Sequence, residues 1–316
     1  MITDKTVFIL GAGASKPYGF PTALELRKDI IYSYPDMLKN AHSEYNKVDI
    51  GKVDFPKRLE NLILTFAASS TKSIDLFLSR NNQFYEDGKK IIAFLIGNYE
   101  MRSKFREDIE KPEFDWYMYI FDFLTKDISN PEDLVSFFEN NHISFITFNY
   151  DRSLEQFLYE SFFNSFTTKR NEIAKLFSKI KIIHVYGKIA ALPFENNYFN
   201  IPYGNPTYFG YLDDLAKNIK IVYEERKEDL REVKQLISEA QRIFFLGFGY
   251  ADENLEALNF NSLIHQGSRI YGTGLGFTES ERRKVVSKLR GKKVEIVSER
   301  FTIDDCDSVM LLRKFL

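Results

Sequence analysis

The 316-residue sequence predicts an α/β fold: a mostly parallel sheet with helices on both faces. Three observations lead to this class. Short apolar runs, such as Val7–Leu10 and residues 142–148, are typical of strands buried on both faces. Two runs, Val7–Leu10 and 243–246, end directly in a Gly-x-Gly turn. Segments with apolar residues at helical spacing separate the runs. This alternation of strand and helix makes the predicted fold Rossmann-like.

The beginning of the chain sets the pattern of strand, glycine turn and helix. After the strand Val7–Leu10 comes Gly11-Ala12-Gly13-Ala14-Ser15, and a helix is predicted over 22–32 with Pro21 near its start. Residues 35–140 differ, because apolar residues recur there at helical spacing and strand-like runs are absent. We therefore predict two parts: a Rossmann-like domain over 1–34 and 141–316, and a helical insertion module over 35–140.

Strands return after residue 141. The run 142–148 is apolar and β-branched, and an amphipathic helix follows over 153–163. Residues 190–227 are predicted to be irregular, because Asn, Pro, Tyr and Gly are frequent there. The other predicted ranges are strands at 180–185, 243–246, 269–271 and 294–297, and helices at 229–241 and 279–289.

Composition excludes several classes of protein. A net charge of −2 and a pI of about 6.2 argue against a dedicated nucleic-acid binder. No run approaches the ~18 apolar residues of a membrane span, and the first residues do not form a signal peptide. Cys306 is the single cysteine and the four histidines are scattered, so we expect no metal site. The expected location is cytoplasmic.

The first glycine turn is a candidate phosphate-binding loop. Gly11 and Gly13 would let the main chain approach a diphosphate, and the start of the next helix would offer N–H groups. The usual dinucleotide fingerprint has a third glycine where this chain has Lys16, and an acidic residue about twenty positions later. Both are missing, so a tight turn without a ligand is the alternative.

A second glycine turn repeats this logic. Gly247 and Gly249 follow the strand 243–246, and Asn254 lies on the first turn of the next helix. Two such turns suit a ligand with two halves and a central diphosphate. Gly272 offers a weaker third copy, for which a plain loop is the alternative.

Polar side chains follow the second and third strands. Asn149 and Asp151 come after 142–148, and His184 ends the third strand just before Gly187. Because parallel strands end at one edge of the sheet, we expect these groups to converge there. An amide can orient a water or a carboxamide, and imidazole is the usual general base at neutral pH. Asp151 or Asn149 could instead cap a helix, and His184 could be a buried structural ring.

In order, the motifs GAGAS, Pro21, TFNYD, HVYG and GFGYADENL resemble the NAD-binding core of the sirtuin-like superfamily. The match spans 7–35 and about 143–276. Segments 73–78 and 88–93 are similar to the bacterial defence branch, which hydrolyses NAD. Deacylase sirtuins have an acid and an arginine after the first glycine turn, and a four-cysteine zinc ribbon. Here 19–24 reads GFPTAL and 188–246 has no cysteine.

The resemblance implies that NAD is the substrate. Asn149 would hold the ribose hydroxyls or the attacking water, His184 would be the general base, and Asp151 would fix the carboxamide. The residues expected to bind NAD are Gly11, Ala12, Gly13, Ala14, Ser15, Pro21, Thr147, Gly187, Gly247, Gly249, Asn254 and Gly272. This hypothesis requires the His184 ring and the Asn149 amide to flank one sugar carbon.

The expected function is NAD hydrolysis to nicotinamide and ADP-ribose, as an NAD-depleting effector in bacterial anti-phage (antiviral) defence. One alternative is an NAD-dependent protein deacylase or ADP-ribosyltransferase. Another is a module that senses NAD or ADP-ribose and acts through a partner. The resemblance also implies a homo-oligomer or a partner protein such as a HerA-type ATPase. We expect no membrane association and no direct nucleic-acid binding.

Overall fold

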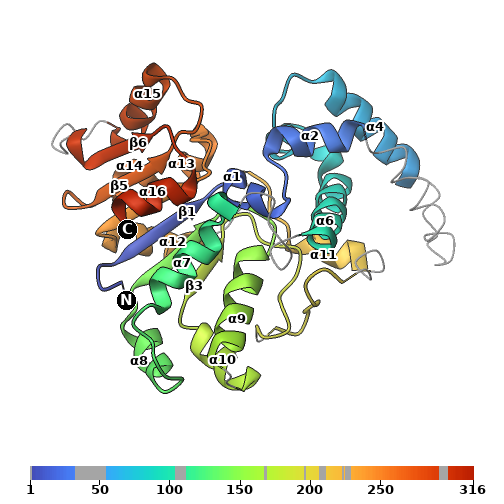
Figure 1. Ribbon diagram of the computed structural model, residues 1–316. Coiled ribbons are helices and arrows are strands. Elements are labelled where there is room, and N and C mark those ends of the chain that lie inside the picture. Colours follow the sequence, from blue (N-terminus) through green and yellow to red (C-terminus); the bar gives the residue numbers. More distant parts are fainter. Residues whose placement is uncertain are drawn as a thin grey trace.

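The structure is a computed structural model, and it describes residues 2–32, 55–103, 112–166, 169–195, 197–205, 211–222, 224, 229–291 and 298–316. Within these ranges six parallel strands form one sheet in the order β3-β2-β1-β4-β5-β6 (Figure 1). The strands are β1 Thr6–Leu10, β2 Ile143–Thr147, β3 Lys181–His184, β4 Arg242–Leu246, β5 Arg269–Thr273 and β6 Phe301–Asp304. This doubly wound order confirms the predicted Rossmann-like α/β class.

Alternate residues of the central strands enter two separate hydrophobic clusters. In β1, Ile9 belongs to one cluster and Phe8 to the other. The Phe8 ring stacks between Phe145 of β2 and Phe244 of β4, with centroids 5.1 and 5.3 Å away. Both faces of the sheet are therefore buried, which explains the continuous apolar runs in the sequence.

Helices cover both faces. One face packs against α7 Trp116–Thr125, α8 Asp133–Asn140, α9 Ser153–Phe166, α10 Arg170–Phe177 and α16 Ser308–Phe315. The other packs against α12 Asp229–Glu239, α13 Asp252–Leu258, α14 Phe260–Leu263 and α15 Glu279–Arg290. The predicted helices over 153–163, 229–241 and 279–289 are confirmed.

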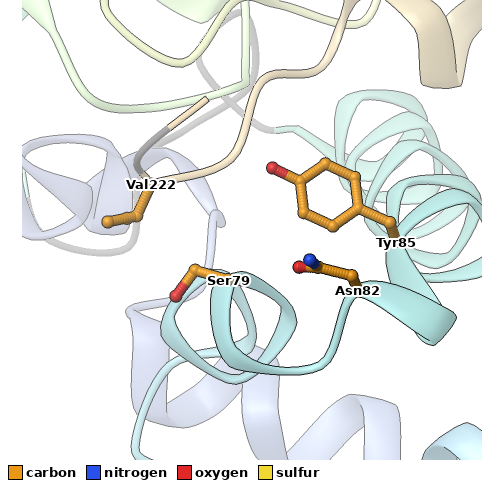
Figure 2. Close-up of a pocket in the computed structure, with 4 residues that line it drawn as sticks. All are labelled: Ser79, Asn82, Tyr85 and Val222. Atoms are coloured by element: carbon orange, nitrogen blue, oxygen red, sulfur yellow. The ribbon is translucent and has the colours of Figure 1, made fainter. Parts of the chain in front are cut away.

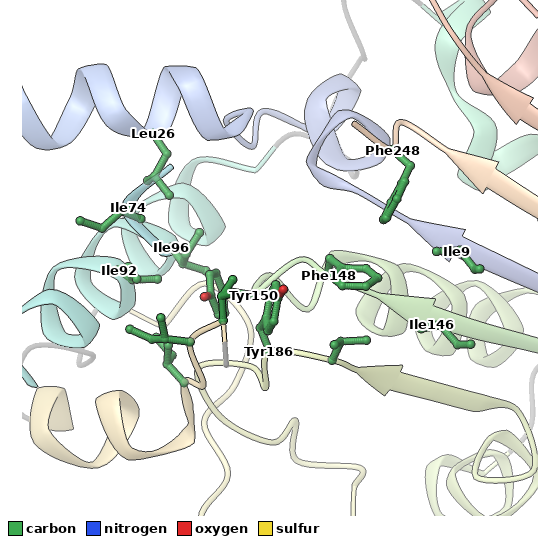
Figure 3. Close-up of a cluster of buried hydrophobic side chains, with 14 of the residues drawn as sticks. Ile9, Leu26, Ile74, Ile92, Ile96, Ile146, Phe148, Tyr150, Tyr186 and Phe248 are labelled. Carbon is green, nitrogen blue, oxygen red and sulfur yellow. The ribbon is translucent and has the colours of Figure 1, made fainter. Parts of the chain in front are cut away.

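The remaining helices lie beyond one end of the sheet. They are α1 Ala12–Ser15, α2 Ala23–Tyr32, α4 Phe55–Ala68, α5 Ile74–Arg80, α6 Tyr85–Arg102 and α11 Leu212–Asn218. The described residues between α2 and β2 contain helices and no strand, as predicted, although α7 and α8 pack on the sheet (Figure 1). One hydrophobic cluster runs without a break from the sheet to α2, α5 and α6 (Figure 3). The division at residue 140 stays a prediction.

Two further predictions, for residues 294–297 and 190–227, have different outcomes. The strand expected at 294–297 lies outside the described residues, and the last strand of the sheet is β6 at Phe301–Asp304, which was not predicted. The segment 190–227 is not irregular throughout, because α11 lies within it. Leu212 and Leu215 are buried in α11, and their three-residue spacing is the helical signal that the surrounding Asn and Pro residues obscured. None of the helices in the described ranges has the length and apolarity needed to cross a bilayer.

Candidate active site

The strand register brings the predicted motifs to one edge of the sheet. Leu10 pairs with Thr147 on one side and with Leu246 on the other, and Thr147 also pairs with His184. The chain leaves β1 and β4 towards opposite faces, since Ala14 and Leu255 lie in different clusters. The edge between β1 and β4 is therefore the topological switch point, where doubly wound sheets bind ligands. The predicted convergence of strand ends is confirmed.

The two glycine turns contact each other directly. The Gly13 N–H donates to the Gly247 carbonyl oxygen at 3.0 Å. A Cβ on Gly11 would lie 2.6 Å from that same oxygen, and a Cβ on Gly247 would lie 2.0 Å from the Ala14 nitrogen. Gly249 differs, because nothing lies within 4 Å of its Cβ position. Glycine is thus required at three positions by contact between the turns, whereas Gly249 borders open space.

This contact uses much of the donor capacity of the first turn. The N–H groups of Gly11, Gly13 and Ala14 donate to main-chain oxygens of the protein at 2.9–3.0 Å. The helix that follows, α1, is a single turn over Ala12–Ser15. These three N–H groups are engaged within the protein, so diphosphate binding by this segment stays a prediction.

Asn149 is buried and its amide is oriented by the first glycine turn. Nδ2 donates to the Gly11 carbonyl oxygen at 3.1 Å and to Ser15 Oγ at 2.9 Å. The Asn149 main-chain N–H donates to Thr147 Oγ1 at 3.0 Å, which fixes the bend after β2. Because these two contacts account for both amide hydrogens, the group that Asn149 can offer a ligand is its Oδ1 acceptor.

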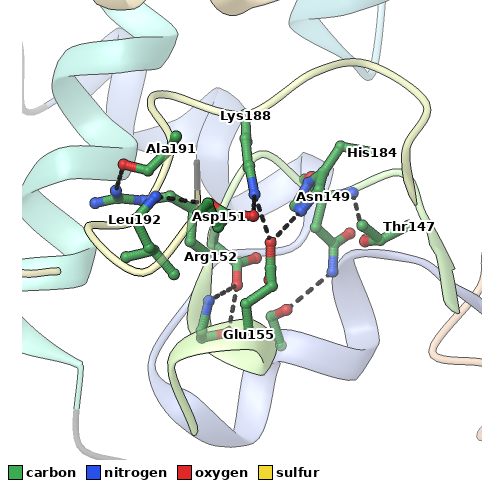
Figure 4. A network of polar contacts seen from close by, with 12 residues as sticks. Thr147, Asn149, Asp151, Arg152, Glu155, His184, Lys188, Ala191 and Leu192 are labelled. Atoms are coloured by element: carbon green, nitrogen blue, oxygen red, sulfur yellow. Dashed lines mark hydrogen bonds and ion pairs between the residues drawn. The ribbon is translucent and has the colours of Figure 1, made fainter. Parts of the chain in front are cut away.

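His184 lies against the main chain of Asn149. Its Nδ1 is 2.8 Å from the Asn149 carbonyl oxygen, and its Nε2 is 2.6 Å from Glu155 Oε1 (Figure 4). Lys188 Nζ contacts the same carboxylate oxygen at 3.1 Å and Glu195 at 2.6 Å. The ring and the Asn149 main chain are thus brought together, while the Asn149 side chain turns towards the first glycine turn.

Glu155 and Lys188 were not identified in the sequence. Glu155 lies in the first turn of α9, four residues after Asp151, on a part of the helix that is buried. Burial raises the pKa of the Glu155 carboxyl, but the charges of His184 and Lys188 outweigh burial and hold the net pKa well below its usual range. A carboxylate among the apolar residues of a helix start was the signal that could have identified it.

Asp151 stabilises the start of α9. It accepts hydrogen bonds from the Ser153 N–H at 3.1 Å and from the Ser153 hydroxyl, which is also 2.7 Å from the Tyr117 hydroxyl. Burial raises the pKa of Asp151, hydrogen bonds from Ser153 and Ser15 offset part of that rise, and the net pKa is about 6. The helix-capping alternative therefore describes the contacts seen, and the contact with a carboxamide stays a prediction.

Asn254 and Pro21 lie at the starts of two helices, α13 and α2. Asn254 Oδ1 accepts a hydrogen bond of 2.6 Å from the Tyr186 hydroxyl, which joins the chain after β3 to α13. Pro21 is half-buried and directly precedes Thr22, whose side chain and Glu25 cap α2 reciprocally. The predicted position of Pro21 at a helix start is confirmed.

Gly187 and Gly272 have local structural roles. Gly187 has a φ of 68°, and a Cβ there would lie 2.0 Å from the Asn218 carbonyl oxygen. A Cβ on Gly272 would lie 2.1 Å from the hydroxyl of Tyr250, a residue whose own φ is 51°. Tyr250 donates to the Thr273 carbonyl oxygen at 3.0 Å. Both glycines make room for neighbouring groups, and their contact with NAD stays a prediction.

A fully buried ion pair connects α6 to the site. Arg152 directly follows Asp151, and its guanidinium contacts both Glu100 carboxylate oxygens, at 3.0 and 2.6 Å. Both side chains are 0% exposed. Arg152 also donates to the carbonyl oxygens of Ala191 and Ile201 at 3.1 and 2.7 Å. The four contacts satisfy a charge that would be costly to bury alone.

The described residues also border a cavity of about 500 Å³. Ser79, Asn82, Tyr85 and Val222 line it (Figure 2). These residues belong to α5, to the 3₁₀ helix Asn82–Phe84, to the start of α6 and to the chain after α11. None of the residues predicted to bind NAD is among them.

Comparisons with known proteins give a likeness of fold only. No protein-family model and no curated protein matches the chain. Solved structures that match include Sir2 with the inhibitor EX-527, 2′-O-acetyl-ADP-ribose and deacetylated p53 peptide, at 17% identity and a TM-score of 0.37, covering 98% of this chain and 91% of that one. Sir2 with p53 peptide and NAD+ matches at 16% and 0.38, covering 98% and 90%. Sir2Tm with a propionylated peptide matches at 16% and 0.37, with the same coverage. Such identities and TM-scores are too low to assign a function.

Proposed function

We propose that this chain hydrolyses NAD: the bond between nicotinamide and ribose breaks, water adds to the ribose, and nicotinamide, ADP-ribose and a proton are released. The observation that carries the proposal is the meeting of two glycine turns at the switch point of the sheet, next to Asn149 and His184. Doubly wound sheets bind nucleotides at such points. The order of the motifs in the sequence supports the same substrate.

Asn149 has the clearest chemical role. With both amide hydrogens used within the protein, its Oδ1 can accept a hydrogen bond from a ribose hydroxyl or from the attacking water. Nicotinamide leaves as a neutral molecule and the ribose passes through an oxocarbenium-like state. The site therefore has to orient the water and stabilise positive charge more than it has to supply a strong acid.

The two turns are the proposed binding segments for the rest of the substrate. We assign the diphosphate to Gly11–Ser15 and the adenosine side to Gly247, Gly249 and Asn254. The open space at Gly249 supports this assignment, because a ligand can approach the main chain there without displacing a protein atom. His184 supports the main chain of Asn149, and Asp151 orders the start of α9 beside them.

Water is the proposed acceptor rather than an acylated lysine. Residues 188–246 contain no cysteine, so this segment cannot form the zinc ribbon that helps build the acyl-lysine groove of deacylase sirtuins. The proposal extends to an NAD-depleting effector in anti-phage defence, active as a homo-oligomer or with a partner such as a HerA-type ATPase. Light scattering on the purified protein, alone and with the products of neighbouring genes, tests the assembly.

Nicotinamide release from NAD, followed by chromatography, tests the activity. We expect Asn149→Ala and His184→Ala each to lose about 10²-fold or more in turnover, because the first removes the Oδ1 acceptor and the second removes the ring that holds the Asn149 main chain in place. His142→Ala is the matched control, because His142 is exposed at the opposite end of β2. Wild-type turnover in both site variants would refute the assignment.

The acceptor is tested in a parallel reaction. NAD is incubated with the protein and an acetylated lysine peptide, and the products are identified by mass spectrometry. ADP-ribose with an unchanged peptide supports hydrolysis. Acetyl-ADP-ribose or an ADP-ribosylated peptide would show that the peptide is the acceptor, and the protein would then be a transferase rather than a hydrolase.

A further inference from the structure

The contacts of His184 determine which protons its ring carries. Nδ1 faces the main-chain carbonyl oxygen of Asn149 and Nε2 faces the carboxylate of Glu155. Both partners only accept hydrogen bonds when Glu155 is ionised. A neutral imidazole has one donor and one acceptor nitrogen, so it would place a lone pair against one of these oxygens. Two acceptors at 2.8 and 2.6 Å are satisfied together only by a ring with two protons.

The charges around the ring point the same way. Glu155 is paired with Lys188, and Lys188 with Glu195, so a positive His184 makes the group of four neutral in total. Asp151 also faces Glu155 from the start of α9, and Tyr117 faces it from α7. Burial raises the pKa of both groups, so Tyr117 stays uncharged, whereas Asp151, with a pKa of about 6, is ionised at pH 7.5 and adds negative charge near the ring. A neutral ring would leave a net negative charge on the group, with the Glu155 and His184 side chains only 2% and 5% exposed.

We propose that Glu155 is the positioning residue of this site and that it keeps His184 doubly protonated in the resting protein. The ring then donates to the Asn149 carbonyl oxygen and fixes the main chain that carries the Asn149 amide. His184 acts by orienting Asn149, and it cannot accept a proton from water until it has given one up. The catalytic role of the oriented Asn149 rests on the proposed function. The protonation of the His184 ring does not, because it is a property of the protein without substrate.

Nitrogen-15 NMR of histidine-labelled protein tests this without any substrate. The His184 signals are identified by their disappearance in His184→Gln. At pH 7.5 the wild-type ring is expected to show two protonated nitrogens. In Glu155→Gln the ring is expected to show a single protonated nitrogen at pH 7.5, because the carboxylate that accepts from its Nε2 has been removed. Glu160→Gln is the matched control: it lies on the same helix and pairs with Arg170 outside this group.

Lys188→Met provides a second variant with a different expected result. It removes the cation that shares Glu155 with the ring and leaves both acceptors of the ring in place, so His184 is expected to keep two protonated nitrogens at pH 7.5. If Glu155→Gln does not fold, Lys188→Met and the wild-type spectrum still test whether the His184 ring carries two protons. A singly protonated wild-type ring at pH 7.5 would overturn the proposal. The same ring protonation in Glu155→Gln as in Lys188→Met would overturn it as well. The spectra are recorded without NAD, so they give the same result whether or not the protein hydrolyses NAD. Failure of this proposal can therefore be told apart from failure of the proposed function.

Discussion

The contact between the two glycine turns gives the sharpest test of the structure. Gly247→Ala places a methyl group 2.0 Å from the Ala14 nitrogen and 2.2 Å from the Gly13 carbonyl carbon. It also forces a φ of 55° on a residue with a side chain. The left-handed conformation costs about 1–2 kcal/mol, and displacement of packed main chain typically costs about 1–3 kcal/mol more. We expect a loss of about 2–5 kcal/mol in the free energy of unfolding.

Gly249→Ala is the matched control, two residues along the same turn. Nothing lies within 4 Å of its Cβ position and its φ is not positive, so the added methyl group meets no atom. Alanine at such a position stabilises a protein by about 0.4–1 kcal/mol, because the unfolded chain has less freedom to lose. The two variants should therefore differ by several kcal/mol although each adds a single methyl group.

The one tryptophan reports on this region. Trp116 is fully buried, and its indole N–H donates to the Ala14 carbonyl oxygen at 2.7 Å. Urea unfolding followed by its fluorescence gives the midpoint and slope for each variant. Equal midpoints for Gly247→Ala and Gly249→Ala would refute the packing of the turns. If the open space at Gly249 receives NAD, Gly249→Ala should also raise KM while its urea midpoint stays at or above that of the wild type.

Three further predictions use other contacts. Glu100→Gln leaves the Arg152 guanidinium buried without its anion. We expect the free energy of unfolding, measured with urea, to fall by about 3–5 kcal/mol. An unchanged urea midpoint would mean that water reaches the pair. Asp151 has a pKa of about 6, above its unfolded value, so its stabilising contribution is complete below pH 4 and lost as pH rises through 6. The urea midpoint should therefore fall between about pH 4 and 6.5 in the wild type relative to Asp151→Asn, and the two should run in parallel above that range. Tyr186→Phe removes the hydrogen bond to Asn254 and should cost about 0.5–1.5 kcal/mol, measured by thermal unfolding against the wild type.

Local patterns in the sequence were sufficient to predict five of the six strands of the sheet. Strands such as β1 are buried on both faces, so their residues are apolar without interruption, and parallel order then places all the strand ends at one edge. The sequence therefore predicted that Asn149 and His184 would meet. It did not predict β6, whose four residues alternate between buried and half-buried positions and include Asp304. So short a run has too few residues to define a period.

The partners of the predicted site residues could not be found in the same way. Glu155 and Lys188 contact each other from a helix and a loop 33 positions apart, and Arg152 and Glu100 are 52 apart. Considered alone, each of these charged residues would be predicted to lie exposed on the surface. Only the fold shows that its charge is buried and matched. The protonation of His184 depends on such partners, so a strand-end histidine by itself could not establish a general base.

The glycines show why a correct pattern can have two physical causes. A Gly-x-Gly turn after a buried strand is required where a phosphate approaches the main chain, and equally where another main chain does. In this protein Gly13 and Gly247 meet the second requirement directly, and Gly249 is the glycine next to open space. A ligand at the switch point would therefore contact the pair of turns as one packed unit. Substitutions at Gly247 and Gly249 separate the two causes, because the first disturbs the protein and the second only the space beside it.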